Sequence, residues 1–460
     1  MERESFKSRL GFLLLSAGCA IGIGNVWRFP YITGKNGGGV FVLFYLFFLI
    51  TVGVPVMTME FAIGRASRQS TVRSYHVLEP AGTKWHWHGY IAMLGNYVLM
   101  SFYTTVAGWM LYYFYQFCVG AFEGLDADGV STAFGSMLGQ PGVMGFWMMV
   151  IILVGFLVCS AGLQKGVERV TKVLMSALLV IILVLAVRAL LLPGGMEGFK
   201  FYLLPSMAKA KEVGLFRVIV EAMNQSFFTL SLGIGAMLIF GSYLQKDRTL
   251  LGESINIAAL DTFVAVMSGL IIFPACFAFG VSPDSGPRLI FITLPNVFNA
   301  MAGGRIWGSL FFLFMTFAAF STIIAVFENL IRCCMDAWEI SRKKAVLINL
   351  VIVSIISVPC VLGFNLWSGF QPLGAGTNVL DLEDFIVSTL LLPIGSLIYL
   401  FFCVSRFGWG FKKYLAEANA GEGPKLPSWL RVYLTWVLPV FVIALLVQGI
   451  GSTVVKLMAG

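Results

Sequence analysis

The sequence predicts an all-α integral membrane protein with about eleven transmembrane helices. Of the 460 residues, 58% are hydrophobic and only 12% are charged, whereas soluble domains carry about 25% charged residues. Apolar stretches of roughly 20 residues, the length that crosses a bilayer, recur along the chain. They lack the alternation of apolar and polar residues that is typical of β-strands. We expect spans at 9–34, 37–64, 89–119, 142–160, 167–192, 216–243, 253–280, 306–336, 343–363, 380–404 and 430–456.

The first span contains residues that an uninterrupted membrane helix avoids. Within the run GCAIGIGNVWRFPYITGKNGGG (18–39), three closely spaced glycines are followed by Asn25, Arg28 and Pro30. Glycine costs a helix about 1 kcal/mol relative to alanine, and proline costs about 3 kcal/mol. Polar groups at membrane depth must face protein or a water-filled cavity. Secondary transporters use such a broken helix to build a site for a small ion or solute, and the run therefore predicts a site of this kind.

A similar sequence in the sixth span indicates an internal repeat. The first span contains AIGIGN at 20–25, and the sixth contains SLGIGA at 231–236. Each begins a group of five spans, and two successive groups of five must insert in opposite orientations. We therefore expect a single transmembrane domain, 1–460, with inverted repeats at 9–192 and 216–404 and one extra helix at 430–456.

The distribution of positive charge indicates how the chain crosses the membrane. The net charge is +8, and Lys and Arg concentrate in the loops on the same side as the N-terminus, which favours a cytoplasmic N-terminus. An odd number of spans then places the C-terminus outside. The loop with Lys200, Lys209 and Lys211 is an exception to this pattern. The charges form no basic stripe, so we do not expect nucleic acid as a partner.

Other functional classes are not indicated by the sequence. The eight cysteines occur singly, except for Cys333–Cys334, and their spacing resembles no zinc or redox motif. We interpret the His86/His88 pair in KWHWH as an interfacial anchor rather than a metal site. We find no acid, base or nucleophile constellation and expect neither an enzyme nor an organic cofactor. No span carries the polar stripe of a channel, and no obligatory protein partner is evident.

Two motifs resemble those of a known family. GNVWRFPYITGKNGGGVF (24–41), taken together with FFTLSLGIG (227–235), resembles the neurotransmitter:sodium symporter family in its bacterial amino-acid branch. The resemblance implies a leucine-transporter-type fold, a multi-pass protein of the bacterial inner membrane, and import by alternating access. It also implies that the first and sixth spans unwind at about Cys19–Gly24 and Thr229–Gly233. Amides freed there would face the carboxylate of an amino acid, because helix N-termini carry partial positive charge.

The same resemblance implies a pocket for a neutral amino acid with a hydrophobic or aromatic side chain. Carriers of monoamines in this family have aspartate where this chain has Gly22, so glycine would leave that space empty and the substrate would bring its own carboxylate. Tyr103 matches the tyrosine that binds this carboxylate and, with Phe228, covers the site. Cys19 and Ile323 depart from the residues usual at their positions. The implied pocket residues are Cys19, Ala20, Ile23, Gly24, Leu99, Tyr103, Phe228, Thr229, Ser231, Ile234, Thr322 and Val326.

Two sodium sites are also implied by the resemblance. The first would combine the substrate carboxylate with oxygens of Ala20, Asn25, Thr229 and Asp261. The second would combine three carbonyls with two hydroxyls, from Gly18, Ile21, Ala318, Ser321 and Thr322. Asparagine is commoner than aspartate at the position of Asp261, and a resident negative charge there would make the chloride that animal relatives need unnecessary.

Charged pairs are expected to gate the site on both sides. By the same likeness, Arg28 and Asp384 would meet across the outer vestibule, either directly or through water. Arg3 and Asp336, with Tyr243 nearby, would close the inner side. Exposed ion pairs are worth little free energy in water, which suits a gate that must open repeatedly.

These expectations define one functional hypothesis and its alternatives. The hypothesis is a chloride-independent, sodium-coupled symporter whose partners are an amino acid and the lipid bilayer. One alternative is a proton-coupled or sodium-independent exchanger, with Asp261 carrying a proton. Another is an amino-acid sensor that no longer transports. Glu60, at the end of the second span, is interpreted as structural.

Overall fold

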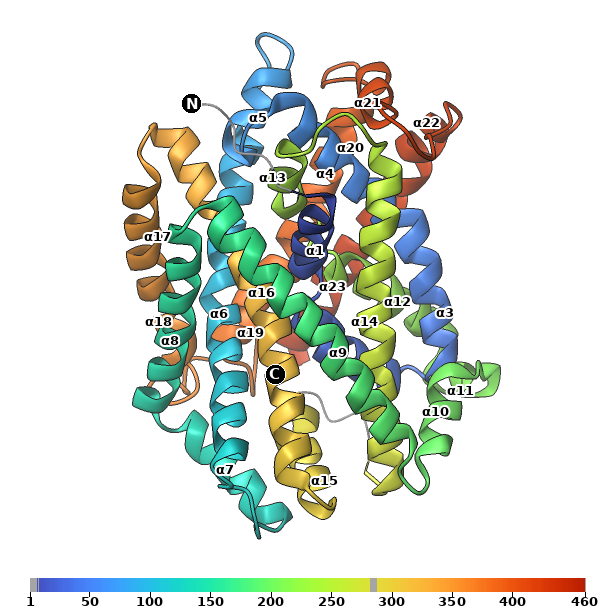
Figure 1. The fold of residues 1–460 in the computed structure, drawn as a ribbon. Helices are drawn as coiled ribbons and strands as arrows, with labels where there is room; N and C mark the ends of the chain where they lie inside the picture. Colours follow the sequence, from blue (N-terminus) through green and yellow to red (C-terminus); the bar gives the residue numbers. More distant parts are fainter. Residues whose placement is uncertain (1–5, 7, 282–287, 460) are drawn as a thin grey trace.

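The computed structural model describes residues 6, 8–281 and 288–459, and this part of the chain is helical without any β-strand (Figure 1). The spans, in chain order, are α1 (Arg9–Ala20) with η1 (Gly24–Arg28) and α2 (Phe29–Lys35), α3 (Gly39–Phe48) with η2 (Leu49–Gly53) and α4 (Val54–Ser67), α6 (Trp87–Cys118), α8 (Pro141–Ser160), η3 (Leu163–Glu168) with α9 (Arg169–Leu190), α12 (Leu215–Thr229) with α13 (Ala236–Ser242), α14 (Leu250–Ala278), α16 (Gly304–Trp338), α17 (Arg342–Ile356) with α18 (Val358–Leu362), α19 (Val379–Asp384) with η5 (Phe385–Leu391) and α20 (Leu392–Val404), and α22 (Leu430–Val432) with η6 (Tyr433–Val437) and α23 (Leu438–Ala459). Shorter helices connect them, namely α5 (Thr71–Leu78), α7 (Ala127–Leu138), α10 (Gly195–Leu203), α11 (Met207–Val213), η4 (Leu289–Thr293) with α15 (Leu294–Ala300), and α21 (Phe411–Ala418).

The number of membrane-spanning helices can be compared with the eleven that the sequence predicts. Within the described residues, nine helices are long and apolar enough to cross a bilayer, and the bent pair Arg9–Ala20 and Gly24–Lys35 makes a tenth. The sixth predicted span appears as α12 and α13, which have 15 and 7 residues and are each too short to count alone. Taken together as one crossing, they bring the count to the predicted eleven. The all-α membrane class is therefore confirmed.

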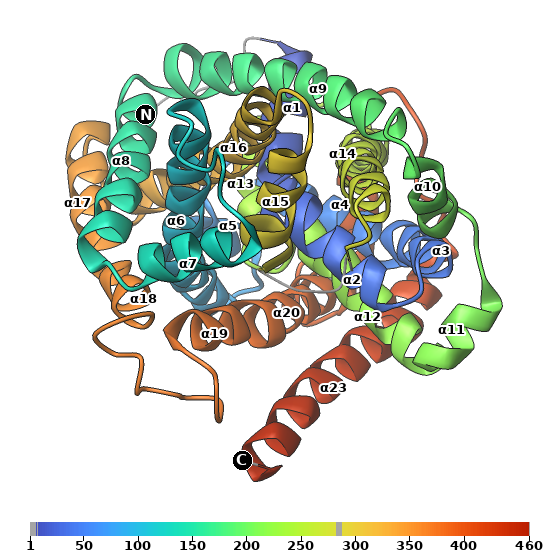
Figure 2. The ribbon, with the colours of Figure 1, turned by 90° about the horizontal axis from the view of Figure 1, so that it is seen from below.

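The two broken spans lie in the middle of the bundle. In the view of Figure 2, α1 and α13 are surrounded by α4, α6, α9, α14 and α16, while α23 leans away at the periphery. Helix α1 packs on α16, α14 and α9, and α13 packs closely on α4. Small residues permit that approach, because a β-carbon at Gly64 of α4 would lie 1.9 Å from the carbonyl oxygen of Leu238. The core thus holds both breaks against long, continuous helices.

Both breaks are displaced from the positions that the family resemblance implied. The first was expected at Cys19–Gly24, but α1 continues through Ala20 and π-helix begins again at Gly24, so only 21–23 lie outside these helices. The two flanking helices differ in direction by 55°. Cys19 and Ala20 stay helical because the α-helical hydrogen bonds continue up to the one that Ile21 N–H donates to the Ala17 carbonyl, 2.6 Å.

The second break was expected at Thr229–Gly233 and instead covers 230–235, between α12 and α13. Its cause is a series of left-handed residues, with φ of 50° at Ser231, 104° at Gly233 and 73° at Gly235. Glycine adopts such angles without strain. It also permits close packing, since a β-carbon at Gly233 would lie 2.1 Å from the Leu392 carbonyl oxygen.

Candidate functional site

The first break exposes backbone groups that side chains then bind. Gly22 N–H donates to Asn25 Oδ1 at 3.2 Å, and Ile23 N–H donates to the hydroxyl of Tyr103 at 2.9 Å. Asn25 comes from the restart of the same span, and Tyr103 comes from α6. The side chains of Asn25 and Tyr103 therefore satisfy the backbone amides that are released where the helix unwinds.

A small cavity lies between the two breaks. Its volume is about 20 Å³, which is room for about one water molecule, so the surrounding side chains are closed together. Seven of the twelve predicted pocket residues line it, namely Ala20, Gly24, Leu99, Tyr103, Phe228, Ser231 and Ile234. Gly22 lines it as well. The lining carries no charged side chain.

The other predicted pocket residues do not line the cavity. They are Cys19, Ile23, Thr229, Thr322 and Val326, all of which are buried. Two residues that line the cavity, Val387 and Leu392, were missed by sequence analysis. Both are aliphatic residues in an aliphatic span, so their types carry no chemical signal. Only the packing of η5 and α20 against the second break reveals them.

The space beside Gly22 is not empty, contrary to expectation. A β-carbon there would lie 2.1 Å from the hydroxyl oxygen of Tyr103 and 2.6 Å from Thr322 Oγ1. Tyr103 reaches this position because its hydroxyl accepts the hydrogen bond from Ile23. Glycine is therefore required for close packing of α6 and α16 against the break, and even a methyl group would collide.

Three residues predicted for the first sodium site meet around one carboxylate. Asp261 is fully buried, its Oδ1 accepts from Asn25 Nδ2 at 2.8 Å, and its Oδ2 accepts from Thr229 Oγ1 at 3.0 Å. The hydroxyl of Tyr45, which sequence analysis missed, donates to the same Oδ2 at 3.4 Å. No cationic side chain pairs with Asp261 in the described part of the chain. A buried carboxylate beside the hydroxyls of Thr229 and Tyr45 fits a small hard cation.

The five residues predicted for the second sodium site also converge. Ser321 Oγ lies 3.0 Å from the Gly18 carbonyl oxygen and 2.9 Å from that of Ala318. Thr322 Oγ1 lies 3.2 Å from the Gly18 oxygen and 3.3 Å from that of Ile21. The carbonyls of Gly18 and Ile21 belong to the end of α1 and its break, whereas both hydroxyls belong to α16. Such a cluster of oxygens from two helices fits a hard cation.

Glu60 anchors the second break. Its buried carboxylate accepts from Gly233 N–H at 2.6 Å and from Met237 N–H at 3.2 Å. Met237 lies in the first turn of α13, where unpaired amides and the helix dipole favour a negative charge. Glu60 therefore has a structural role, as the sequence indicated: it holds the start of α13 in place.

The proposed outer gate does not form a direct pair. Among the described residues, no ion pair joins Arg28 to Asp384; the Arg28 guanidinium lies 4.1 Å from the ring centroid of Phe228, and Asp384 Oδ1 accepts from Ser388 Oγ at 2.6 Å. Both residues line a cavity of about 280 Å³. Arg28 thus contacts the ring of Phe228 and Asp384 bonds to Ser388, instead of pairing with each other.

The proposed inner gate is only partly covered by the structure. Arg3 lies outside the described residues. Asp336 Oδ2 accepts from the backbone N–H of Ser70 at 2.8 Å. Tyr243 donates to Glu328 Oε1 at 3.2 Å, and Arg342 pairs with that buried carboxylate. Sequence analysis missed Glu328 and Arg342, because a charged pair split between two spans gives no local motif.

A helical membrane bundle with two interrupted spans and oxygen clusters at the interruptions defines a secondary transporter. The chain matches the sodium:neurotransmitter symporter family over residues 3–122 and 129–458 and belongs to that family. It is therefore a multi-pass, sodium-coupled symporter of a small-molecule substrate, as its resemblance to this family implied.

Individual relatives are similar over nearly their whole length. A protein of Bacillus subtilis described as the uncharacterized sodium-dependent transporter YhdH is 32% identical over 448 residues, which are 96% of this chain and 97% of that protein. An uncharacterized sodium-dependent transporter of Haemophilus influenzae is 29% identical over 462 residues, 98% of each chain. The crystal structure of MhsT in complex with L-phenylalanine has a TM-score of 0.86 and 35% identity, covering 97% of this chain and 100% of the other.

Proposed function

We propose that this symporter imports a neutral, hydrophobic or aromatic amino acid together with two sodium ions and without chloride. The observation that carries the proposal is the cavity between the breaks, which is lined by glycines, Tyr103, Ser231 and apolar side chains and has no charged residue of its own. An amine without a carboxylate would find no anion there. A zwitterion would place its carboxylate at the first break, beside the hydroxyl of Tyr103, and its side chain against Leu99, Ile234 and Val387. MhsT, which shares this fold, binds L-phenylalanine.

The two oxygen clusters support a stoichiometry of two sodium ions. One surrounds Asp261, and the other joins α1 to Ser321 and Thr322. Each sodium ion moving inward contributes about 2.3 kcal/mol per 100 mV, and a tenfold concentration gradient adds about 1.4 kcal/mol. Two ions supply roughly 7 kcal/mol, which is sufficient for a substrate gradient above ten-thousandfold.

Chloride independence follows from the charge on Asp261. Its carboxylate lies among the hydroxyls of Tyr45 and Thr229 and the amide of Asn25, so a negative charge is already present beside the proposed ion. A second anion would be repelled by that carboxylate in a buried site of low dielectric.

The orientation follows from the charge distribution. We place the chain in the bacterial inner membrane with the N-terminus in the cytoplasm and the C-terminus outside. In this orientation Arg28 and Asp384 face the outside, and Tyr243 and Asp336 face the cytoplasm.

Uptake into proteoliposomes tests the proposal. Radiolabelled L-phenylalanine should accumulate under an inward sodium gradient, equally with chloride or gluconate, and faster when the interior is negative. Uptake that follows a proton gradient without sodium would instead establish the exchanger, and sodium-dependent binding without any uptake would establish a sensor. Uptake of phenethylamine in place of the amino acid would refute the assignment of the substrate.

A further inference from the structure

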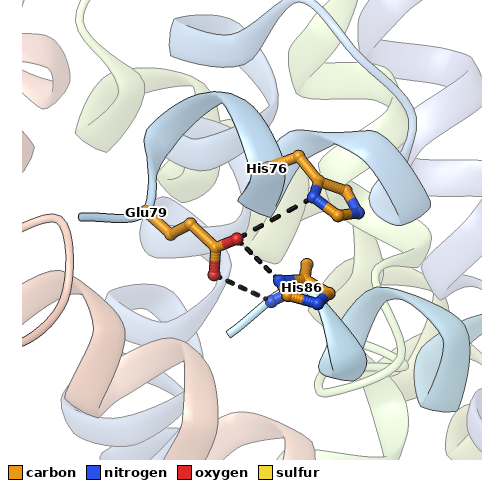
Figure 3. Close-up of side chains that lie close together, drawn as sticks. All are labelled: His76, Glu79 and His86. Atoms are coloured by element: carbon orange, nitrogen blue, oxygen red, sulfur yellow. Dashed lines mark hydrogen bonds and ion pairs between the residues drawn. The ribbon is translucent and has the colours of Figure 1, made fainter. Parts of the chain in front are cut away.

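Two histidines and a glutamate meet at the turn between α5 and α6, away from the transport site (Figure 3). His76 lies in the last turn of α5, Glu79 follows that helix, and His86 precedes α6. Glu79 Oε1 lies 2.6 Å from His86 Nδ1 and 3.8 Å from His76 Nδ1. One ligand atom from each residue lies within 4.8 Å of the other two. Three side chains that can bind a metal thus bring their ligand atoms close together.

The glutamate is held in place by its other oxygen. Glu79 Oε2 accepts from the backbone N–H of His86 at 3.1 Å and from Thr83 Oγ1 at 3.3 Å. The backbone N–H of Glu79 itself donates to the Tyr75 carbonyl at 2.7 Å. These bonds fix the carboxylate and leave Oε1 turned toward both imidazoles. Groups that orient a ligand in this way are typical of metal sites.

We propose that His76, Glu79 and His86 form a binding site for a divalent transition-metal ion of the zinc class. Imidazole nitrogen and carboxylate oxygen bind zinc at about 2.0–2.2 Å, so tetrahedral ligand atoms lie about 3.3 Å apart. The observed separations of 2.6 and 3.8 Å lie on either side of that value. With three protein ligands, water takes the fourth position.

At least one of the two rings must rotate to bind a shared ion. They are now stacked, with centroids 4.3 Å apart and planes 16° from parallel, whereas a metal lies in the plane of each imidazole that binds it. His76 has a 43% exposed side chain and can turn, and His86 is 25% exposed. Only the neutral imidazole binds metal, so binding releases any proton that Nδ1 shares with Glu79.

The third histidine of the chain provides a matched control. His88 lies two residues beyond His86, yet it is buried between the rings of Tyr75 and Tyr399, with centroid distances of 5.5 and 4.9 Å. His86 and His88, although close in sequence, therefore lie in different surroundings, and His86 lies beside His76. The chain has three histidines in total. A histidine affinity tag would add further imidazoles that bind zinc, so it must be removed before measurement.

Calorimetric titration of the purified full-length protein with zinc, and absorption spectra with cobalt, test the site. We expect one zinc ion per chain in the wild type, and H76A, H86A and E79Q to bind about tenfold more weakly or worse. H88Q and C118S, which changes the exposed cysteine, should bind as the wild type does. The cobalt spectrum should show tetrahedral bands without a thiolate charge-transfer band.

The proposal is overturned if wild-type protein binds no zinc at millimolar concentration. It is equally overturned if H76A and H86A, folded as judged by thermal melting, keep wild-type affinity, or if the cobalt spectrum shows a thiolate ligand. None of these outcomes depends on transport activity, so the test is independent of the identity of the transported amino acid.

Discussion

The hydroxyl of Tyr103 occupies the place that a side chain at Gly22 would need. A β-carbon at Gly22 would lie 2.1 Å from this oxygen, which also accepts a hydrogen bond of 2.9 Å from Ile23 N–H. The scaffold helix α6 thus reaches into the break of the first span. The contact links a residue that lines the cavity to the backbone of the broken helix.

Replacing Gly22 by alanine should therefore impair substrate binding. The added methyl group must displace Tyr103 or Thr322, and overpacking of this kind costs about 1–3 kcal/mol. We expect substrate affinity to fall by about tenfold to hundredfold, measured by equilibrium binding. Gly145→Ala on α8, where nothing lies within 4 Å of the new carbon, should leave affinity unchanged. Equal affinity of G22A and wild type would show that the break accommodates a side chain.

Ser321→Ala should weaken sodium binding. The variant removes one oxygen from the cluster that joins α16 to the Gly18 carbonyl, and we expect the sodium concentration for half-maximal uptake to rise by about fivefold or more. Ser160→Ala is a matched control, because Ser160 also bonds to the carbonyl three residues earlier in its own helix, at 2.7 Å, but is exposed. If both variants show the same sodium dependence, the cluster does not bind the ion.

Asp261→Asn should change the ion requirement. The amide keeps the size of the side chain but removes the charge that attracts a cation and repels chloride. We expect the half-maximal sodium concentration to rise by about tenfold, or chloride to become stimulatory. Asp128→Asn, at an exposed position of α7, serves as the control. Unchanged dependence on both ions in D261N would remove Asp261 from the coupling site.

Glu60→Gln should loosen the second break. The carboxylate accepts two backbone hydrogen bonds, and bonds to charged groups contribute about 1.5–3 kcal/mol each. We expect a lower melting temperature together with weaker substrate binding, since Gly233 and Met237 flank the restart of α13. Glu339→Gln changes a 76% exposed glutamate that pairs with Arg73 on the surface and should have little effect. If E60Q lowers the melting temperature but the folded protein binds substrate as tightly as the wild type does, the hydrogen bonds of Glu60 do not contribute to substrate binding.

The sequence predicted the helical class because apolar length and the scarcity of charge report directly on the lipid environment. The glycines of the first and sixth spans indicated that both are interrupted, and the family resemblance then located the two interruptions within a few residues. Their exact limits depend on hydrogen bonds and left-handed angles, such as that of Ser231, which composition does not reveal. Helix α1 therefore continues further than the family resemblance implied.

The family resemblance implied both polar and apolar members of the proposed sites. Asp261, Asn25 and Ser321 are polar residues in apolar spans, and the fold brings each to the cluster that the resemblance implied. Val387 and Leu392 have the composition of any membrane helix, so only three-dimensional packing identifies them. Tyr45 was also missed, since tyrosine is common in membrane spans and its bond to Asp261 crosses 216 positions of sequence.

Equilibrium binding of two matched ligands, with sodium or potassium as the cation, tests the central claim most directly. L-phenylalanine and phenethylamine differ only in the carboxylate that we place beside the first break and the sodium ion. We predict that purified protein binds L-phenylalanine in sodium, loses this binding in potassium, and fails to bind phenethylamine in either. Binding of L-phenylalanine that is equally tight in potassium, or binding of phenethylamine with similar affinity, would contradict the account.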